Sequence, residues 1–343
     1  MTNVHIVIPD LFLPQQLSAY VCTDLRVPAL EKLLARGRSE LLGIDTLEAW
    51  LCHRFGVDEN AIAPVTLLAD GLQPGSSYWL RADPVGISIQ RDQITLKSDI
   101  TLSAAEAAQL CDNLNTHFSA EGFRFHAPHP QRWYLQLEHA PALKTYALPQ
   151  VVGVNMQEYL PLGDDALRWH SVMNEIQMLF HEHAVNHARE REGKYQVNGV
   201  WLWGGGTLPL GLLKPYTGVL GDSDLARAFA QAAGLPVVNR IEHTPHGQET
   251  DQGDLLLVFD QLRTAMQCAE IDNWRRDIYF FEKNYAEPLL ELLKVGTVNQ
   301  ITLDVLCEQA TRRFIVTHEA LWKIWRKPKP LNYYALTKCS IQT

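Results

Sequence analysis

Short apolar runs alternate along the chain with segments of helical periodicity. Residues 4–8 and 254–259 are nearly unbroken apolar runs, and each is closely followed by an aspartate, Asp10 or Asp260. Runs of this kind predict buried strands, with the two aspartates at their carboxyl ends. Further strands are expected at 199–203, 301–307 and 312–317.

Helical patterns separate these runs. Residues 28–36 carry leucines at the spacing of one helical face, begin at Pro28 and end before Gly37, as helix start and stop signals require. Further helices are expected at about 46–54, 165–183, 224–233 and 270–295. The alternation of strands and helices predicts an α/β protein, in which a mostly parallel sheet that includes 199–203 is covered by helices on both faces. Because parallel strands present their carboxyl ends on one side, we expect Asp10, Asp260 and the glycines at 204–206 at the same edge of the sheet.

The pattern changes after about residue 64. Alternating apolar residues predict strands before and after one helix, and Ser103 and Glu106 form a capping box at the start of that helix. This order suits a small inserted α+β module. We therefore expect a core made of residues 1–64 plus 152–343, with an α+β cap at 65–151.

Composition narrows the class of protein. Of 343 residues, 46% are hydrophobic and 20% charged, as in ordinary globular proteins. The net charge of −9 makes nucleic acid an unlikely partner, because phosphate contacts need a basic surface. No apolar run is long enough to span a membrane, and the N-terminus does not resemble a signal peptide. Six scattered cysteines without a CxxC pair fit a reducing compartment, so we expect a cytoplasmic protein. Because no apolar run could span a membrane, we expect no membrane partner.

Residues 174–206, NEIQMLFHEHAVNHAREREGKYQVNGVWLWGGG, join a polar helix to an apolar strand that stops at three glycines. Ligands of α/β proteins gather at such strand ends, so the stretch predicts a pocket wall. It resembles the NE…HPVN.ER…G…AN…WGxG segment of archaeal-type cofactor-independent phosphoglycerate mutases, in the alkaline phosphatase superfamily. Residues 27–38 and 217–238 also resemble segments of that family. The bacterial branch of RpfE-type regulatory proteins gives the closest resemblance.

The resemblance implies an alkaline-phosphatase-like core with a cap, and a site with two metal ions and a hydroxyl nucleophile. Asp10 matches the first aspartate of the family's PDG motif, but Leu11 replaces its glycine. The sequence after Asp260 lacks the histidine of the family's ligand loop, and in place of a late PDH motif Asp304 is followed by Val305. Asp10 and Asp260 are therefore candidate remnants of a metal site.

The segment that resembles the nucleophile region is also altered. Residues 37–56 stand in its place, and neither Ser39 nor Thr46 matches the nucleophile well. The sequence therefore predicts a degenerate site and a regulatory or phosphometabolite-binding protein without mutase activity. The alternative is a divergent mutase or phosphohydrolase that depends on Mn or Mg. No cofactor is assigned unless that alternative holds.

The same stretch supplies candidate ligand-binding residues. Asn186 and Arg189 resemble the family's polar cluster, and arginine suits a phosphorylated metabolite. The backbone of Gly204, Gly205 and Gly206 allows close approach of an anion. The competing interpretation is a solvated helix of mixed charge. For the binding interpretation too, Arg189 is expected to be exposed, so Arg189→Ala should weaken anion binding and leave stability nearly unchanged.

Two further motifs, a pair of histidines and an aromatic and basic segment, could each serve either binding or structure alone. His183 and His187 have zinc-ligand spacing only if one helix continues through Ala184, where the family has proline and a helix break. Residues 320–334 interleave aromatic and basic side chains, which suits a protein partner or, alternatively, aromatics packed on the core with cations in water. A purely structural interaction protein that uses this segment is the third functional class.

Overall fold

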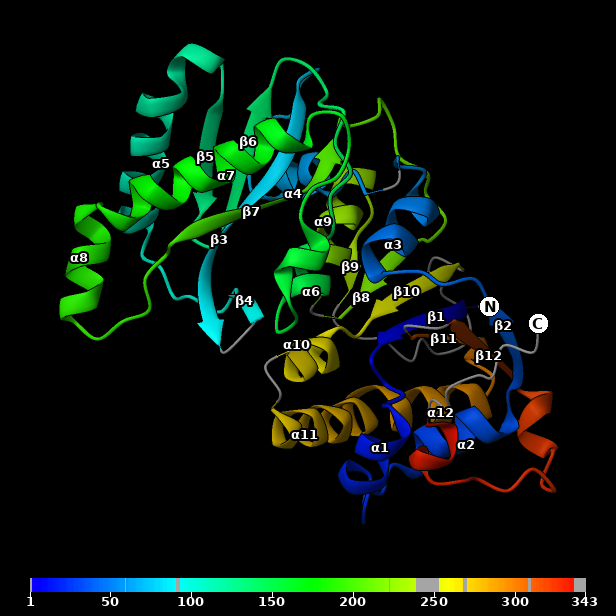
Figure 1. Cartoon of the computed structure of the whole chain (residues 1–343). Coiled ribbons are helices and arrows are strands. Elements are labelled where there is room, and N and C mark those ends of the chain that lie inside the picture. The colour runs from blue at the N-terminus through cyan, green and yellow to red at the C-terminus, as the bar shows by residue number, and fades with distance from the viewer. Residues whose placement is uncertain are drawn as a thin grey trace. The chain divides into compact units, whose positions relative to one another are not determined.

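The computed structural model describes residues 2–58, 60–90, 93–221, 223–238, 253–267, 270–307 and 310–335. The chain forms two compact units, the first made of residues 1–51 and 213–343 and the second of residues 52–212 (Figure 1). The fold is α/β, as the alternation of apolar and helical patterns predicts.

The first unit is built on a seven-stranded, mostly parallel sheet. In spatial order its strands are β2 (Arg38–Leu42), β12 (Thr311–Thr317), β11 (Val298–Leu306), β1 (Thr2–Pro9), β10 (Asp254–Val258), β8 (Gly218–Leu220) and β9 (Val237–Val238). β1 lies in the centre and pairs in parallel with both β10 and β11. Only the edge that contains β12 and β2 is antiparallel.

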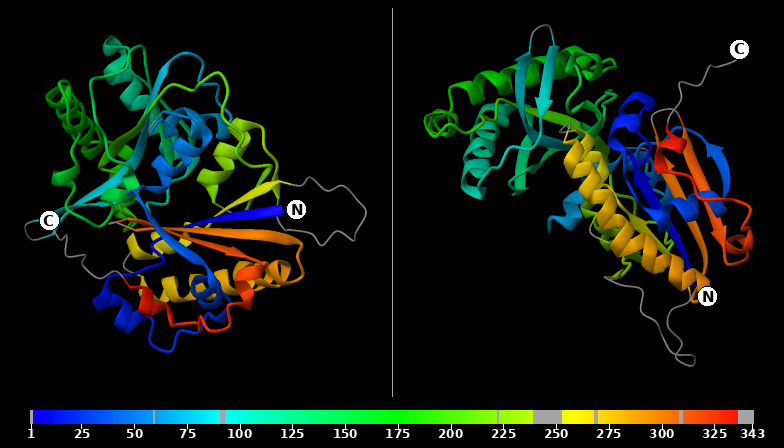
Figure 2. Two further views of the ribbon diagram at one scale, coloured as in Figure 1. Left: turned by 90° about the vertical axis from the view of Figure 1, so that its right-hand side faces the viewer. Right: turned by 90° about the horizontal axis from the view of Figure 1, so that it is seen from below.

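Helices cover this sheet because its strands are apolar on both faces. The helices of the unit are α1 (Gln15–Val21), α2 (Pro28–Arg36), α3 (Leu47–Phe55, which crosses into the second unit), α9 (Asp224–Ala233), α10 (Gln261–Gln267), α11 (Ile271–Phe281) and α12 (Glu287–Lys294). Ile6 and Ile8 of β1 pack in one core with leucines of α2 and with Trp274 of α11. Figure 2 shows α11 and α12, in yellow and orange, running along the face of the sheet on which this core lies.

The start of α2 depends on a buried carboxylate. Its N-cap residue, Val27, has no side-chain hydrogen bond to offer. Glu282, in a π-helical turn between α11 and α12, instead accepts hydrogen bonds from the backbone N–H groups of Ala29 and Leu30, at 2.6 and 2.9 Å. The first N–H groups of a helix need hydrogen-bond acceptors, and Glu282 supplies them. These two bonds hold the start of α2 against the turn between α11 and α12.

The second unit contains an antiparallel sheet. Its strands run in the order β4 (Gln93–Lys97), β3 (Tyr78–Gln90), β6 (Arg132–Leu137) and β5 (Arg124–His129), and β7 (Gly199–Gly206) also pairs with β3. Its helices are α4 (Ile62–Ala69), α5 (Ala104–His117), α6 (Leu148–Val151), α7 (Ala166–His181) and α8 (Ala184–Arg191). The capping box of Ser103 and Glu106 begins α5, as predicted.

The division of the chain differs from the expected one. Residues 152–212, assigned to the core from sequence, group with the second unit. The reason is that β7 pairs with β3 in the antiparallel sheet and α7 contacts β7. The prediction that β7 belongs to the parallel sheet is therefore wrong.

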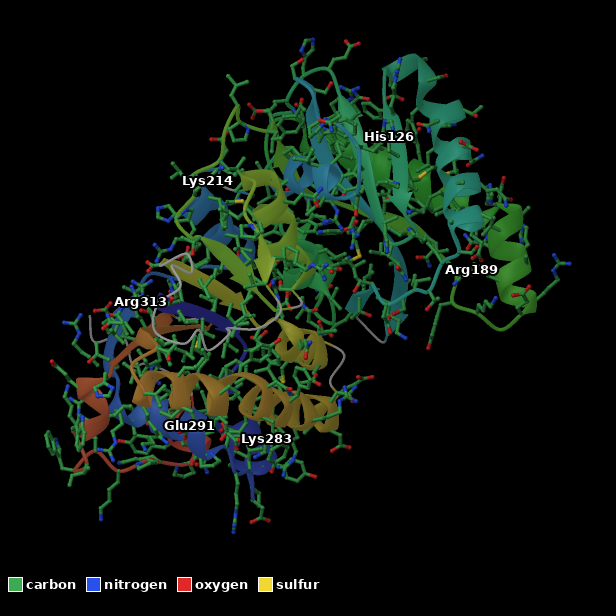
Figure 3. The ribbon with its side chains drawn as sticks, turned by 180° about the vertical axis from the view of Figure 1, so that it is seen from behind. His126, Arg189, Lys214, Lys283, Glu291 and Arg313 are labelled. Atoms are coloured by element: carbon green, nitrogen blue, oxygen red, sulfur yellow. The ribbon has the colours of Figure 1, made fainter. Side chains whose placement is uncertain are left out.

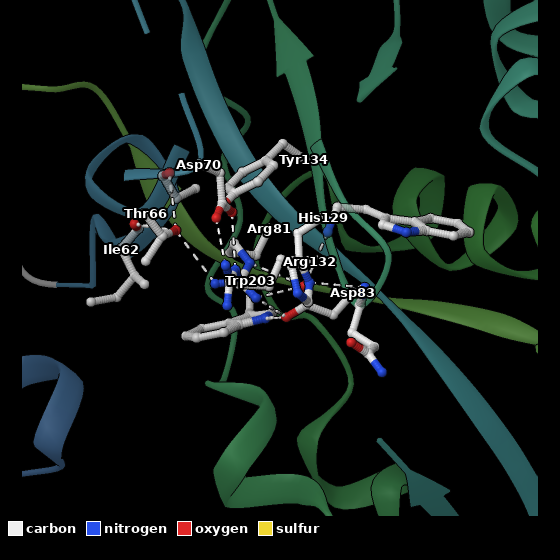
Figure 4. A network of polar contacts seen from close by, with 12 residues as sticks. Ile62, Thr66, Asp70, Arg81, Asp83, His129, Arg132, Tyr134 and Trp203 are labelled. Carbon is white, nitrogen blue, oxygen red and sulfur yellow. Dashed lines mark hydrogen bonds and ion pairs between the residues drawn. The ribbon is translucent and has the colours of Figure 1, made fainter. Parts of the chain in front are cut away.

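A buried polar network joins the strands of the second unit (Figure 4). Arg81 of β3 binds the carboxylate of Asp83 through Nε and Nη2, at 2.8 to 3.0 Å. Trp203 of β7 donates to the same carboxylate at 2.8 Å, and the backbone N–H of Trp133 in β6 donates at 3.3 Å. A satisfied network of this kind fixes which strands become neighbours.

Candidate functional site

The carboxyl ends of β1 and β10 bring two predicted site residues to one edge of the sheet. Because Val7 of β1 lies beside Val258 of β10 in a parallel pair, Asp10 and Asp260 follow neighbouring strands at the same end. That part of the prediction is confirmed. The expectation that Gly204, Gly205 and Gly206 share this edge is wrong, because β7 belongs to the other sheet.

Asp10 has an unusual backbone conformation. Its φ of 56° lies in the left-handed region, which costs a non-glycine residue on the order of 1 kcal/mol. Trp274 of α11 donates to its carbonyl oxygen at 3.1 Å, and its own N–H donates to Leu306 at 3.3 Å. These contacts hold the turn in place at the end of the central strand.

Asp260 is held by the start of a helix. Ser223, the N-cap of α9, donates its hydroxyl hydrogen to Asp260 at 2.6 Å and accepts from the N–H of Ala226. Burial raises the pKa of Asp260, and this effect outweighs the opposing hydrogen bond from Ser223 and the charge of Arg263.

Arg263, one turn after Asp260 on α10, supplies a cation at this edge. It binds Glu48 of α3 through both terminal nitrogens, at 2.8 and 3.2 Å, and the Glu48 side chain is buried. Burial alone would lower the pKa of Arg263, but the charges of Glu48, Asp10 and Asp260 outweigh burial and raise it. One guanidinium group thus pairs with Glu48 and interacts electrostatically with two further carboxyl groups (the Arg263 cluster: Asp10, Glu48, Asp260 and Arg263).

These residues do not fit a divalent metal ion well. Tight metal sites need several converging ligands, and among the described residues no group of three or more histidine, cysteine or acidic side chains has metal-site geometry. A metal ion beside Asp10 and Asp260 would also be repelled by the charge of Arg263.

Asp304, the third aspartate suggested by the resemblance, lies inside a second ion-pair cluster. Its carboxylate binds Arg313 through two bonds of 2.7 Å and contacts His5 at 2.9 Å. Trp50 donates to it at 3.3 Å, and the His5 ring also contacts the hydroxyl of Tyr216 at 2.9 Å. Burial would raise the pKa of Asp304, but the hydrogen bonds from Arg313 and His5 outweigh burial and hold it well below the usual value.

Asn186 and Arg189 lie in the second unit and have internal partners. Asn186 donates to the carbonyl oxygens of Phe180 and Val197 and accepts from the N–H of Val197, at 2.6 to 3.0 Å. It therefore joins the end of α7 to the segment that enters β7. A ligand could use this side chain only by breaking these bonds.

Arg189, labelled in Figure 3, is 3% exposed rather than solvated. It donates to the carbonyl oxygens of Tyr195 and Thr101 and to Glu106, at 2.7 to 3.1 Å. The expectation of an exposed arginine is wrong, because helix α8 packs this face against the start of α5. Arg189 also lines a cavity of about 400 Å³ with Lys194 and other residues, so binding of a small anion there stays a prediction.

The three glycines serve close packing inside the second unit. A Cβ on Gly206 would lie 2.3 Å from that of Ala61, and one on Gly205 would lie 2.4 Å from the hydroxyl of Tyr78. Gly204 has φ of 65° and packs against Ile62 of α4. The glycine run is thus the end of a paired strand rather than a loop.

The histidine pair follows the helix-break interpretation. α7 ends at His181 and α8 begins at Ala184, with His183 as the N-cap whose Nδ1 accepts from the N–H of Val185 at 3.2 Å. His183 is thus an N-cap with extended backbone, and its Nδ1 is used by the cap, so it is not a residue on the face of a continuous helix as the zinc interpretation requires.

Sequence reasoning did not identify Glu48 and Arg263 as site residues. Their contact joins positions 215 residues apart, and no local pattern marks such a pair. The available signal was a charged residue three positions after the strand-end aspartate, in a segment for which the sequence analysis expects no helix.

Replacing Asn186 by alanine should lower the free energy of unfolding by about 3 kcal/mol, because three buried backbone groups lose their partner. Asn174→Ala, on the exposed face of α7, should change it by less than about 0.5 kcal/mol. Chemical denaturation of both variants tests this. Equal stability would contradict the structural role of Asn186.

Glu106 should make stability depend on pH. Burial would raise its pKa, but hydrogen bonds from the backbone and hydroxyl of Ser103 and from Arg189 lower it from 4.5 to about 2. A lowered pKa stabilises the fold above the unfolded value, and this contribution is lost as pH falls from 4.5 towards 2. Glu106→Gln should therefore be less stable at pH 7 and lose less stability over that range.

Acid denaturation curves of wild type, Glu106→Gln and the exposed control Glu190→Gln measure this difference. The control should follow the wild type. A Glu106→Gln curve parallel to the wild-type curve would show that the ion pair with Arg189 contributes nothing.

Comparisons with known proteins support a phosphoglycerate-mutase-like relationship. No family model matches the chain. It is 23% identical to the 2,3-bisphosphoglycerate-independent phosphoglycerate mutase of Methanosarcina mazei, over 91% of this chain and 84% of that protein. It is 25% identical to the protein of the same name from Methanosarcina acetivorans, over 90% and 83% of the two chains.

Among solved structures, the PH0037 protein from Pyrococcus horikoshii is similar in fold, with a TM-score of 0.52, 12% identity and coverage of 92% of this chain and 87% of that one. In the described part of the chain, no helix combines the length and apolar character needed to cross a membrane. The chain is therefore similar, over most of its length, to cofactor-independent phosphoglycerate mutases.

Proposed function

We propose that this chain is a phosphoglycerate-mutase-like protein with a degenerate metal and nucleophile site. It acts as a regulatory or phosphometabolite-binding protein, as expected for the RpfE-type branch, and does not catalyse the mutase reaction. The observation that carries the proposal is the Arg263 cluster, in which a guanidinium stands among the strand-end carboxylates.

The chemistry of that cation supports the proposal. A metal ion in this position accepts substrate oxygens as ligands and lowers the pKa of bound water. A guanidinium does neither, because it has only hydrogen-bond donors and keeps its proton. Its bidentate pair with Glu48 also uses the donors that a phosphoryl group would need.

The electrostatics also limit where a phosphorylated ligand can bind. The Arg263 cluster has three carboxyl groups for one guanidinium, so it repels phosphate. Cations elsewhere must supply the attraction, and the cavity beside Arg189 and Lys194 is one candidate. A protein partner at residues 320–334 remains part of the regulatory proposal.

One observation favours the alternative of a divergent metal-dependent mutase or phosphohydrolase. The left-handed conformation of Asp10 stores strain at the end of the central strand, and such strain is common at functional sites. In that case Asp10 and Asp260 would hold Mn or Mg after Arg263 moves away.

We expect Arg263→Gln to lower the free energy of unfolding by about 3–5 kcal/mol, because Glu48 loses its buried partner. MnCl₂ should restore part of this loss in the variant and leave the wild type unchanged, since only the variant lacks the guanidinium that repels a metal ion from these carboxyl groups. Arg276→Gln, on the exposed surface of α11, is the matched control. Stabilisation of the wild type by Mn would favour the metal-dependent alternative.

The wild-type protein should show no appreciable mutase turnover with manganese, cobalt or magnesium. A coupled assay and calorimetric titration with phosphoglycerates measure turnover and binding separately. Binding without turnover is the expected result. Turnover of even about 1 s⁻¹, which lies within the usual range of enzymatic rates, would contradict the proposal. Absence of both would leave the interaction protein as the better hypothesis.

A further inference from the structure

Arg36, the last residue of α2, has a largely buried guanidinium with two nitrogen atoms that lack a partner in the described part of the chain. It is 7% exposed. Among the described residues, neither Nε nor Nη1 of Arg36 has a hydrogen-bond partner, although both atoms are buried. A guanidinium stays charged at any physiological pH, and burying it unpaired is unfavourable. Buried polar atoms of this kind call for a ligand or another explanation.

Other arginines of the chain show what a structural guanidinium looks like. Arg189, which is also buried, has an acidic partner and two carbonyl oxygens. Arg81 has the carboxylate of Asp83. Among the described residues, Nε and Nη1 of Arg36 have no such acceptor. Packing of the aliphatic part of the side chain can explain why those methylene groups are buried, but not why the charged group is buried with them.

Further cations surround Arg36. Lys32 lies one turn earlier on the same side of α2, and Lys294 ends α12, which packs against α2. Burial, and then the charges of Lys294 and Arg36, lower the pKa of Lys32. A nearby carboxylate is Glu291, which binds Lys294 at 2.5 Å and is labelled in Figure 3. Lys32 thus interacts electrostatically with two cations, Lys294 and Arg36, and with the carboxylate of Glu291.

The C-terminal segment brings more positive charge to α2. Arg326 donates to the carbonyl oxygen of Gly37 at 2.9 Å, and the backbone of Leu331 hydrogen-bonds Glu31. The red segment in Figure 1 accordingly runs beside α2. Its basic residues between these two anchors are Arg326, Lys327 and Lys329, in a chain whose net charge is −9.

We propose that Arg36, Lys32 and Lys294 form a binding site for an oxyanion of the phosphate class. The planar fork of Arg36 suits two parallel hydrogen bonds to such a group, and the lysines add charge. The site lies on the helical face of the first unit, away from the strand ends that carry the Arg263 cluster. It does not depend on the proposed function.

The phosphate group has two plausible sources with the same chemistry, a soluble phosphate compound or a phospholipid headgroup. The second is considered because Trp322, Ile324 and Trp325 are exposed close to Arg326. Exposed tryptophan beside lysine and arginine suits the interface of an anionic membrane.

The test uses the full chain and inorganic phosphate, with thermal unfolding and calorimetry in chloride-matched buffer. Phosphate should raise the melting temperature of wild type and of the exposed control Arg38→Met. Arg36→Met should lose this response while being at least as stable as wild type without phosphate, because a buried unpaired charge is removed. Lys32→Met should weaken phosphate binding about tenfold.

No response of the wild type to millimolar phosphate, or an unchanged response in both Arg36→Met and Lys32→Met, would overturn the proposal. If Arg36→Met does not fold, the phosphate response of Lys32→Met and Lys294→Met is measured instead, and an unchanged response in both variants overturns the proposal. Arg263→Gln should keep the phosphate response, so failure of this site and failure of the proposed function are distinguishable.

Vesicle sedimentation separates the two sources. Vesicles of phosphatidylcholine with phosphatidic acid, and of phosphatidylcholine alone, are compared for wild type and for the Trp322→Ala, Trp325→Ala double variant. Binding to the acidic vesicles that needs both tryptophans and Arg36 identifies a headgroup site. A phosphate response without vesicle binding identifies a soluble ligand. Absence of both overturns the site.

Discussion

Guanidinium groups neutralise the buried carboxylates on which both units depend. Three of the pairs join elements that are distant in sequence or lie on neighbouring strands, whereas Arg81 and Asp83 lie two residues apart on β3. Removing the cation from a buried pair is strongly unfavourable. The pairs are Arg263 with Glu48, Arg313 with Asp304, Arg189 with Glu106, and Arg81 with Asp83. The strand order, the attachment of α8 and the chemistry of the sheet edge all follow from these contacts.

The proposed function depends on the pair of Arg263 and Glu48. Here a protein cation lies near the carboxylates that follow β1 and β10. On the proposed function, this guanidinium stands where the family resemblance implies a metal ion. A guanidinium lacks the open coordination positions that metal-assisted phosphoryl transfer requires.

Local signals in the sequence predicted local structure well. Pro28 and Gly37 bound α2, the capping box begins α5, and Gly234 ends α9 in a left-handed conformation. Each of these signals acts through atoms a few residues away, so one sequence is enough to interpret it.

Features that depend on distant partners were not predictable in the same way. The apolar pattern of β7 shows that the strand is buried but does not say whether its neighbour is parallel or antiparallel. The charged run around Arg189 reads as a solvated helix, because Glu106 lies 83 residues away. Asp10 and Asp260 were placed at one edge correctly, since that inference needed only parallel strands.

A cation that is part of the chain differs from a bound ion in one further respect. A metal leaves its site when its free concentration falls, so occupancy follows the supply in the surroundings. The guanidinium of Arg263 is attached covalently, is present once per molecule and cannot be removed by a chelator. The charge of this guanidinium is therefore present at any metal concentration, and Glu48 keeps the same counterion whatever the supply of metal.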